Sequence, residues 1–146
     1  MRVQYTRDMP APPERVWPFL TDPTQMNRWS EARIEALEPG PAGGFGEVGA
    51  TRRVHAPAPL GMTTVLDEVV VEADAPHRLV YRVTKGGPIR NHRGEVIIEA
   101  TDSGSRLTWT VDFMGKVPGT GPVIKLVLNP TLRRSIDKIA DVVAEG

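Results

Sequence analysis

Apolar and polar positions alternate along most of the chain with the period of a β-strand. At the start, Val3 and Tyr5 share one face and their polar neighbours the other, which predicts a half-buried strand over residues 1–8. The same period returns between residues 32 and 114, in segments separated by turns rich in Gly, Pro, Asp and Ser. We predict six further strands, which form an antiparallel meander: 32–38, 47–55, 62–73, 78–84, 91–101 and 105–114.

The last segment changes to the period of a helix. Over residues 120–145, apolar positions recur every three or four residues opposite charged ones, which predicts an amphipathic helix. Asn129 and Pro130 fall inside this segment. We expect a kink there, or a new helix that Asn129 caps and Pro130 begins. The apolar stripe comprises Leu128, Leu132, Ile136, Ile139, Ala140 and Val143.

Two short helices are expected between the first two strands. Pro12 and Pro13 precede an apolar stretch, and a helix tolerates proline in its first turn. Pro18 falls within this helix, where it removes one backbone hydrogen bond or kinks the helix. The Thr21-Asp22-Pro23 stretch then begins a second short helix that runs toward Trp29.

This order of elements implies an α+β fold with a curved sheet. Seven strands about 4.8 Å apart make a sheet more than about 30 Å wide, whereas a helix with its side chains is about 10–12 Å across. A single helix cannot cover such a sheet while it is flat, so the sheet must curl around the long C-terminal helix. A curled sheet tends to leave space beside the helix, and such concave apolar spaces bind small ligands. The alternative is that bulky side chains fill the space.

Composition narrows the choice of function. A chain of 146 residues is expected to form one domain, residues 1–146, and its eighteen basic residues balance eighteen acidic ones, so nucleic acid is not an expected partner. There is no cysteine, and the three histidines lack metal-site spacing, so we expect neither a metal nor a cofactor. Without a signal-like or membrane-length apolar run, the protein is expected to be soluble and cytoplasmic, without stable membrane insertion.

One stretch imitates a nucleotide-binding motif. Residues 44–49 read GFGEVG and match the pattern G-x-G-x-x-G. That motif works only where a strand precedes the glycines and a helix follows them, because the helix N-terminus holds the pyrophosphate. Here β-branched, alternating residues follow, and Pro57 and Pro59 come before a helix could form. We therefore predict a turn that enters a strand.

The predicted order of elements, together with residues 11–32 (APPERVWPFLTDPTQMNRWSEA) and residues 76–81 (PHRLVY), resembles the START-like (SRPBCC) superfamily. The similarity covers essentially the whole chain and is greatest for the polyketide cyclase/dehydrase and lipid-transport branch. Pro18 departs from the pattern, because a helix former is usual there. The resemblance implies a helix-grip fold with a ligand cavity between the sheet and the C-terminal helix. It does not fix the activity, since carriers of lipids, sterols or quinones, aromatase/cyclases and protein-binding modules share this fold.

The strand at 47–55 carries the first candidate polar residue of such a cavity. Arg52 shares its parity with Val54, so both side chains are predicted to face inward, where Arg52 can hold a carboxylate or a ketone. A register slip of one residue would instead expose Arg52 and turn Arg53 and His55 inward.

Neighbouring strands offer further polar candidates. His92 is predicted to point inward beside Gly94, whose missing side chain leaves room next to the imidazole, so that it can orient a ligand or act as a general base. The alternative is a histidine at the end of a strand that is simply hydrogen-bonded or solvated. Tyr81 is predicted to place its hydroxyl in the same space. In the strand at 62–73 both faces carry an acid, so the pattern leaves open whether Asp67 or Glu68 points inward.

Aromatic and aliphatic residues complete the predicted binding surface. Trp109 and Phe113 lie on the apolar face of the last strand, where they either stack on a ligand or are simply part of the core. Trp29 either lines the entrance to the cavity or plugs its end. The predicted ligand-binding set is Trp29, Arg52, Val54, Tyr81, His92, Val96, Trp109, Val111, Phe113, Ile124 and Leu128.

Three classes of function follow. The leading hypothesis is a noncatalytic protein that binds or transports a hydrophobic small molecule, such as a lipid, a quinone or a polyketide-like compound. The second is a polyketide aromatase/cyclase or dehydratase, in which Arg52 and Tyr81 polarise a ketone and His92 removes an α-proton. The third is a module that binds a protein partner through its sheet face or through Arg133 and Arg134. We expect a monomer or a weak homodimer.

Overall fold

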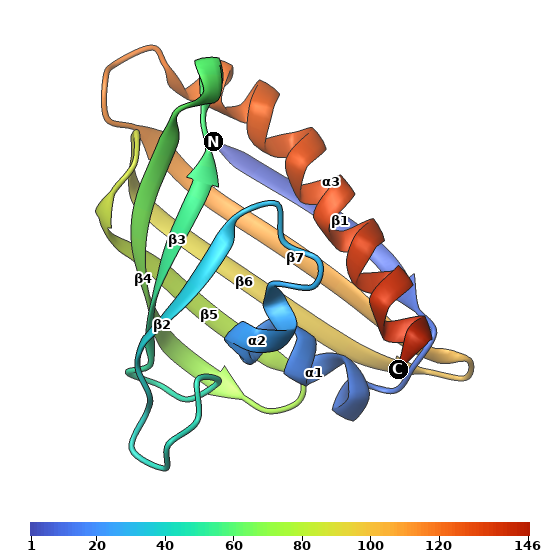
Figure 1. The fold of residues 1–146 in the computed structure, drawn as a ribbon. Helices are drawn as coiled ribbons and strands as arrows, with labels where there is room; N and C mark the ends of the chain where they lie inside the picture. The colour runs from blue at the N-terminus through green and yellow to red at the C-terminus, as the bar shows by residue number, and fades with distance from the viewer.

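A computed structural model describes residues 1–146, except for the side chain of Pro59. The strands, which Figure 1 labels, are β1 (Arg2–Met9), β2 (Arg33–Glu38), β3 (Thr51–Pro57), β4 (Thr63–Asp74), β5 (Arg78–Gly86), β6 (Ile89–Thr101) and β7 (Gly104–Gly115). The helices are α1 (Pro13–Thr21), α2 (Pro23–Met26) and α3 (Gly121–Glu145), with a short 3-10 turn, η1, at Pro59–Gly61.

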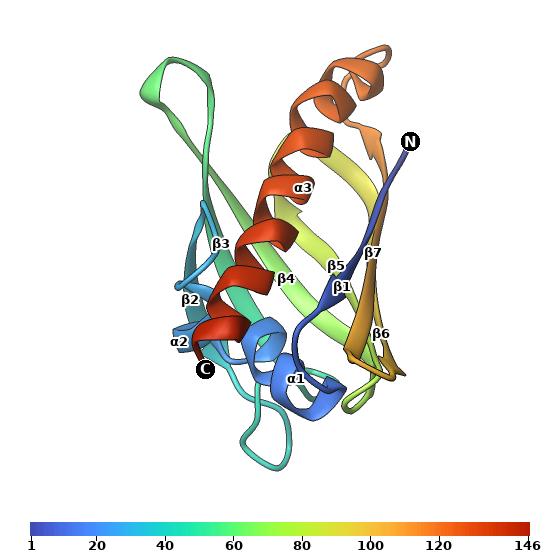
Figure 2. The ribbon, with the colours of Figure 1, turned by 90° about the vertical axis from the view of Figure 1, so that its right-hand side faces the viewer.

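The seven strands form one antiparallel sheet in the order β1-β7-β6-β5-β4-β3-β2. The sheet curls around α3, which lies along β1 and β7, and we call the region between the sheet and α3 the grip. Helices α1 and α2 close its end near the C-terminus (Figures 1 and 2). This arrangement is the helix-grip fold, so the predicted α+β class, the curved seven-stranded sheet and the two short helices are confirmed.

The short helices follow from their local sequence. Proline occupies the first turn of both helices, where its missing N–H removes no helical hydrogen bond. Pro18 does not end α1, because the N–H of Asp22 still bonds to the Pro18 carbonyl at 2.9 Å. The Asp22 carboxylate then accepts from the N–H of Thr24 at 2.9 Å and caps α2.

One of the two alternatives at Pro130 and the predicted start of one strand are wrong. No new helix begins at Pro130, because α3 runs unbroken from Gly121 to Glu145, and its N-cap is Thr120 rather than Asn129. One proline removes a single hydrogen bond, and apolar residues that pack on the core lie on both sides of it, Leu128 before and Leu132 after. Strand β3 begins at Thr51 rather than at residue 47, because residues 47–50 form a turn in which Gly49 has a φ of +94°.

The GFGEVG stretch is part of this turn, as predicted. The described residues immediately after it form β3, and no helix opens there to hold a phosphate. The dinucleotide interpretation is therefore excluded by the local structure.

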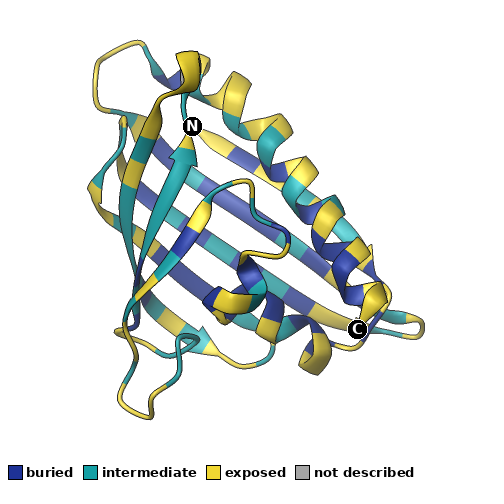
Figure 3. Cartoon of the chain, in the orientation of Figure 1, coloured by how far each residue is buried: buried dark blue, intermediate teal, exposed yellow. Residues whose placement is uncertain are grey.

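Burial differs between the two faces of the sheet. The concave face and the second half of α3 carry the core, which Figure 3 shows as the dark blue segments. In the described part of the chain, no helix has both the length and the apolar character that crossing a membrane requires.

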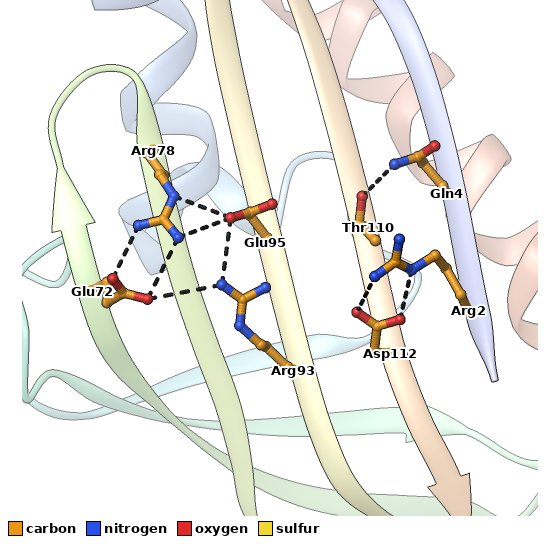
Figure 4. Close-up of polar contacts among 8 residues, drawn as sticks. All are labelled: Arg2, Gln4, Glu72, Arg78, Arg93, Glu95, Thr110 and Asp112. Carbon is orange, nitrogen blue, oxygen red and sulfur yellow. Dashed lines mark hydrogen bonds and ion pairs between the residues drawn. The ribbon is translucent and has the colours of Figure 1, made fainter.

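Charged side chains pair on the convex face (Figure 4). Arg78 of β5 reaches Glu72 at 3.1 Å and Glu95 at 2.9 Å, and Arg93 extends the group. Val80 belongs to β5 and is fully buried. The pairs join β4, β5 and β6 on the solvent-facing side of the sheet.

Candidate functional site

A buried ion pair lies on the concave face, between β3 and β4. Arg52 and Glu68 are directly opposite each other in the β3–β4 pairing, and the guanidinium Nε donates to Glu68 Oε1 at 2.8 Å. Their side chains are only 8% and 12% exposed. The second side of the guanidinium faces the sulfur of Met26, at 3.2 Å from Nη1. Arg52 thus occupies the inward position that its parity predicts.

The neighbouring charged residues point to the convex face. Arg53 pairs with Asp67 at 2.8 Å, and His55 pairs with Glu35 at 3.0 Å. The pairing register therefore answers the question that the sequence left open: Glu68 is the inward acid, because it lies across from Arg52.

Tyr81 links the ion pair to the aromatic core. The guanidinium of Arg52 lies 5.2 Å from the centre of the Tyr81 ring, and the Trp109 indole N–H donates to the Tyr81 hydroxyl oxygen at 2.9 Å. Burial raises the pKa of Tyr81 far above its ordinary value, so the phenol stays protonated. No hydrogen bond among the described residues uses the phenol proton.

His92 is inward, as predicted, and is held by the backbone. Its ring lies 5.3 Å from that of Tyr81, and its Nδ1 accepts from the N–H of Val83 at 3.1 Å. Burial lowers the pKa of His92, which favours the neutral ring. Because Nδ1 accepts a hydrogen bond, the neutral imidazole carries its proton on Nε2.

The space beside Gly94 is not free for a ligand. A β-carbon at this position would overlap the Tyr81 ring, which lies directly against the Gly94 backbone. The expectation of room beside His92 was therefore wrong, because a side chain from the adjacent strand β5 fills it.

Trp29 plugs the end of the grip. It is 7% exposed, its indole N–H donates to the Phe19 carbonyl at 2.7 Å, and its ring meets Trp109 edge-on with centroids 5.9 Å apart. Of the two interpretations given to this residue, the burial of the ring between Phe19 of α1 and Trp109 of β7 favours the plug.

The aliphatic candidates divide along the length of the grip. Val96, Val111 and Phe113 are buried in the core beside the aromatic residues. Val54, Ile124 and Leu128 pack on this core but remain partly exposed. The grip is thus closed at the α1 end and more open toward the start of α3.

The clearest hollows among the described residues lie outside the aromatic core. A narrow pocket beside Arg52 has no room for a water molecule, and its lining includes Glu68 and Phe45. An open groove of about 550 Å³ runs along the start of α3. It is lined by Met1, Pro122, Lys125, Leu126, Asn129 and Pro130.

Sequence reasoning missed one contact of this site and left another undecided. Met26 lies in a four-residue helix without clear periodicity, so nothing in the sequence places its sulfur at Arg52. Glu68 could be chosen only from the pairing register of β3 with β4, which sets it opposite Arg52.

Comparison with known proteins now identifies the family. Residues 1–144 match the family described as polyketide cyclase/dehydrase and lipid transport. The chain belongs to this family. No curated protein matches it. The family match agrees with the resemblance found in the sequence, and it fits both hydrophobic ligand binding and polyketide cyclase/dehydrase activity.

Solved structures share the fold at low identity. A START superfamily protein from Mycobacterium smegmatis has a TM-score of 0.84 and 17% identity, over 99% of this chain and 97% of that one. The Zhui aromatase/cyclase from Streptomyces sp. R1128 has a TM-score of 0.82 and 17% identity, over 99% and 93%. A Mesorhizobium loti protein has a TM-score of 0.76 and 18% identity, over 99% and 98%. These similarities establish the START-like fold.

Proposed function

We propose that this protein binds a hydrophobic small molecule, of the lipid, quinone or polyketide type, between the concave face of the sheet and the first half of α3. One observation carries the proposal. Val54, Ile124 and Leu128 lie on the surfaces that face each other across the grip, yet they stay partly exposed, whereas the same stripe is buried from Leu132 onward. An apolar ligand would cover these three side chains and gain the free energy of their burial.

The polar residues at the inner end of this space would orient the ligand. The Tyr81 hydroxyl has a proton to donate, and Arg52 carries a positive charge beside it. A carbonyl or carboxylate oxygen suits both groups, while the aromatic rings of Trp109 and Tyr81 suit a flat apolar body. A hydrophobic molecule with one oxygen-bearing end is therefore the best match.

The same geometry supports recognition better than proton abstraction. A general base needs a free lone pair within reach of the substrate proton. Nδ1 of His92 already accepts from the Val83 amide, and Nε2 carries the proton. Glu68 is engaged by Arg52. The aromatase/cyclase function of the Zhui protein thus has no matching base in the arrangement seen here.

The test is binding of a fluorescent long-chain fatty acid and of a hydrophobic quinone, measured in solution without vesicles, together with native mass spectrometry of the freshly purified protein. We expect saturable binding near one molecule per chain. Leu128→Asp should weaken it at least about tenfold, since a carboxylate would have to be desolvated against the ligand.

Val123→Asp is the matched control, because Val123 lies on the exposed side of the same helix and is 63% exposed. It should bind as the wild type does. Circular dichroism and melting curves verify that both variants fold. An absence of saturable binding, or equal loss in both variants, would contradict the proposal.

A further inference from the structure

Exposed apolar side chains are concentrated at one end of the molecule. Among the described residues, ten large apolar side chains are exposed, and only Val48, in the β2–β3 loop, lies elsewhere. Leu60 is 98% exposed and has a left-handed φ of 62°, so it projects from its hairpin without support. The other eight are Met1, Met62, Val65, Met114, Val117, Val123, Leu126 and Val127. We call these nine residues the apolar tip.

The segments that carry the apolar tip lie at the same end of the molecule. Gly87 of the β5–β6 turn lies against Thr64 of β4, next to the β3–β4 hairpin that carries Leu60. The N–H of Lys116, in the β7–α3 loop, bonds to the Pro88 carbonyl at 2.9 Å. Met1 lies beside Gly121 at the start of α3. Figures 1 and 2 both place this hairpin, the β7–α3 loop and the start of α3 at the same end.

This end is also positively charged. The segments 1–7, 55–66, 75–94 and 113–136 contain no aspartate or glutamate. Lys85, Arg90, Lys116 and Lys125 are exposed there, and none of them forms an ion pair with a described residue. Because the whole chain has a formal net charge of zero, this positive charge is local. Of the acids beside these segments, Asp67 pairs with Arg53 and Asp112 with Arg2.

We infer that the apolar tip docks on the surface of an anionic phospholipid bilayer. A patch of this kind on a monomer usually marks an interaction site. Aliphatic and methionine side chains ringed by basic residues suit the boundary between acyl chains and negatively charged headgroups.

The composition of the tip favours lipid over a protein partner. Protein interfaces are enriched in aromatic residues and arginine and depleted in lysine. The nine tip residues include no aromatic side chain, and of the four exposed basic residues named above, which form no ion pair, three are lysines. The tip also consists of separate projections, a hairpin, a loop and a helix end, that can enter a soft headgroup layer individually.

This surface goes beyond the proposed ligand site and does not depend on it. Ile124 and Leu128 face the grip, whereas Val123, Leu126 and Val127 are exposed on the same two turns of α3. Docking would therefore bring the open half of the grip against the bilayer. A lipid-like ligand, if it is bound there, could exchange with the membrane over a short path.

The experiment is cosedimentation of the full chain with ligand-free vesicles. One set is pure phosphatidylcholine, and the other is phosphatidylcholine with about one third phosphatidylserine, whose negative surface attracts basic residues. The wild type should bind the anionic vesicles and not the neutral ones. Raising the salt to about 0.5 M should weaken binding at least about fivefold, because it screens the charges.

Two pairs of variants separate the tip from the rest of the surface. The Leu60→Asp, Leu126→Asp double variant should lose at least about tenfold in vesicle affinity. Val48→Asp, which changes the one exposed apolar residue outside the tip, should bind normally. The Lys116→Gln, Lys125→Gln double variant should lose several-fold in affinity for the anionic vesicles. Lys138→Gln, at the other end of α3, should keep the wild-type affinity. All these side chains are exposed, so melting temperatures should stay unchanged.

Several results would overturn the inference. One is no binding to anionic vesicles, and another is binding that the tip variants do not reduce. A concentration-dependent dimer that Leu126→Asp abolishes, without vesicle binding, would assign the tip to contact between two copies. Stoichiometric capture of an acidic protein without vesicle binding would assign it to a protein partner. Fatty-acid binding measured without vesicles is a separate readout, so failure of docking and failure of the ligand site remain distinguishable.

Discussion

Gly94 shows how one missing side chain shapes the site. The Tyr81 ring occupies the place where a β-carbon on residue 94 would lie, and that position fixes the ring under Arg52 and beside Trp109. Glycine at this point of β6 is therefore required by packing rather than by backbone conformation.

The first prediction concerns this contact. Gly94→Ala should lower the free energy of unfolding by about 1–3 kcal/mol, because the added methyl group forces the ring to move in a filled core. Urea denaturation measures it. In a Tyr81→Ala background the same substitution should cost clearly less, since the overlapping ring is gone. An equal cost in both backgrounds would mean that Tyr81 is not the obstacle.

His92 should make stability depend on pH. Burial holds its pKa in the folded protein below the ordinary value of about 6.5, so the unfolded chain binds more protons as the pH falls through that value. The free energy of unfolding should therefore decrease below about pH 6.5, by at most about 1.4 kcal/mol per pH unit for this one group, and level off below the folded pKa.

The matched variant is His92→Asn, whose side-chain oxygen can still accept from the Val83 amide. Its stability should change less than that of the wild type between about pH 6.5 and pH 5. Below about pH 4.5 both proteins should lose stability, because Glu35, Asp67, Glu72 and Asp112 have lowered pKa values in the folded state. Parallel curves between pH 6.5 and pH 5 would assign the transition to another group.

At the scale of elements, the β3–β4 pairing places two ion pairs on opposite faces of one hairpin. Arg52 and Glu68 are buried on the concave face, whereas Arg53 and Asp67 are more exposed on the convex face, and both pairs have N–O distances of 2.8 Å. Arg53 makes two hydrogen bonds to Asp67, whereas Arg52 makes one to Glu68, so a larger contribution of the buried pair would have to come from its burial.

Glu68→Ala should therefore destabilise the protein by about 3–5 kcal/mol, because it leaves a buried guanidinium without its partner. Asp67→Ala, one residue away, should cost about 1 kcal/mol or less, because water can replace the lost carboxylate. Denaturant titration of both variants is the measurement. Similar costs for the two would show that burial does not decide the contribution of these pairs.

Pro130 tests how α3 tolerates an interior proline. Pro130→Ala restores a backbone donor and should stabilise the protein by about 1–3 kcal/mol, since position 130 is exposed and the helix continues on both sides. Pro122→Ala is the control, because Pro122 lies in the first turn, where the N–H has no helical partner, and it should change stability by less than about 0.5 kcal/mol. Destabilisation by Pro130→Ala would indicate that the ring itself contributes packing in the groove along α3.

At the scale of the whole molecule, α3 is buried unevenly along its length. Apart from Gly121, its buried residues all lie between Leu132 and Val143, while the stripe before Leu132 is only partly covered. The half of the helix nearest the apolar tip is thus held by fewer contacts, which is the property expected of a segment that admits a ligand.

Hydrogen exchange followed by mass spectrometry should detect this difference. Amides in residues 122–131 should exchange faster than those in residues 132–143, because local opening there exposes less buried apolar surface. A saturating fatty acid should slow exchange in the first segment and leave the second nearly unchanged. Uniform protection along α3 without ligand would contradict the open half of the grip.

The sequence alone determined the architecture of this protein. Periods of two and then of three to four residues, with turn residues between them, predicted the strands, the C-terminal helix and the curvature that one helix under seven strands requires. These features depend on residues that are close in the sequence, or on the width of a sheet compared with the diameter of a helix. The inward positions of Arg52 and His92 followed from parity within a strand for the same reason.

Only the tertiary structure decided how the concave face is filled. The choice of Glu68 over Asp67 rests on the register of the β3–β4 pairing, and the place of the Tyr81 ring rests on the absence of a β-carbon in the next strand. The apolar tip is assembled from segments far apart in the sequence, each unremarkable by itself. Such features depend on which residues pairing and curvature bring together, and hydrophobic periodicity within one segment does not encode them.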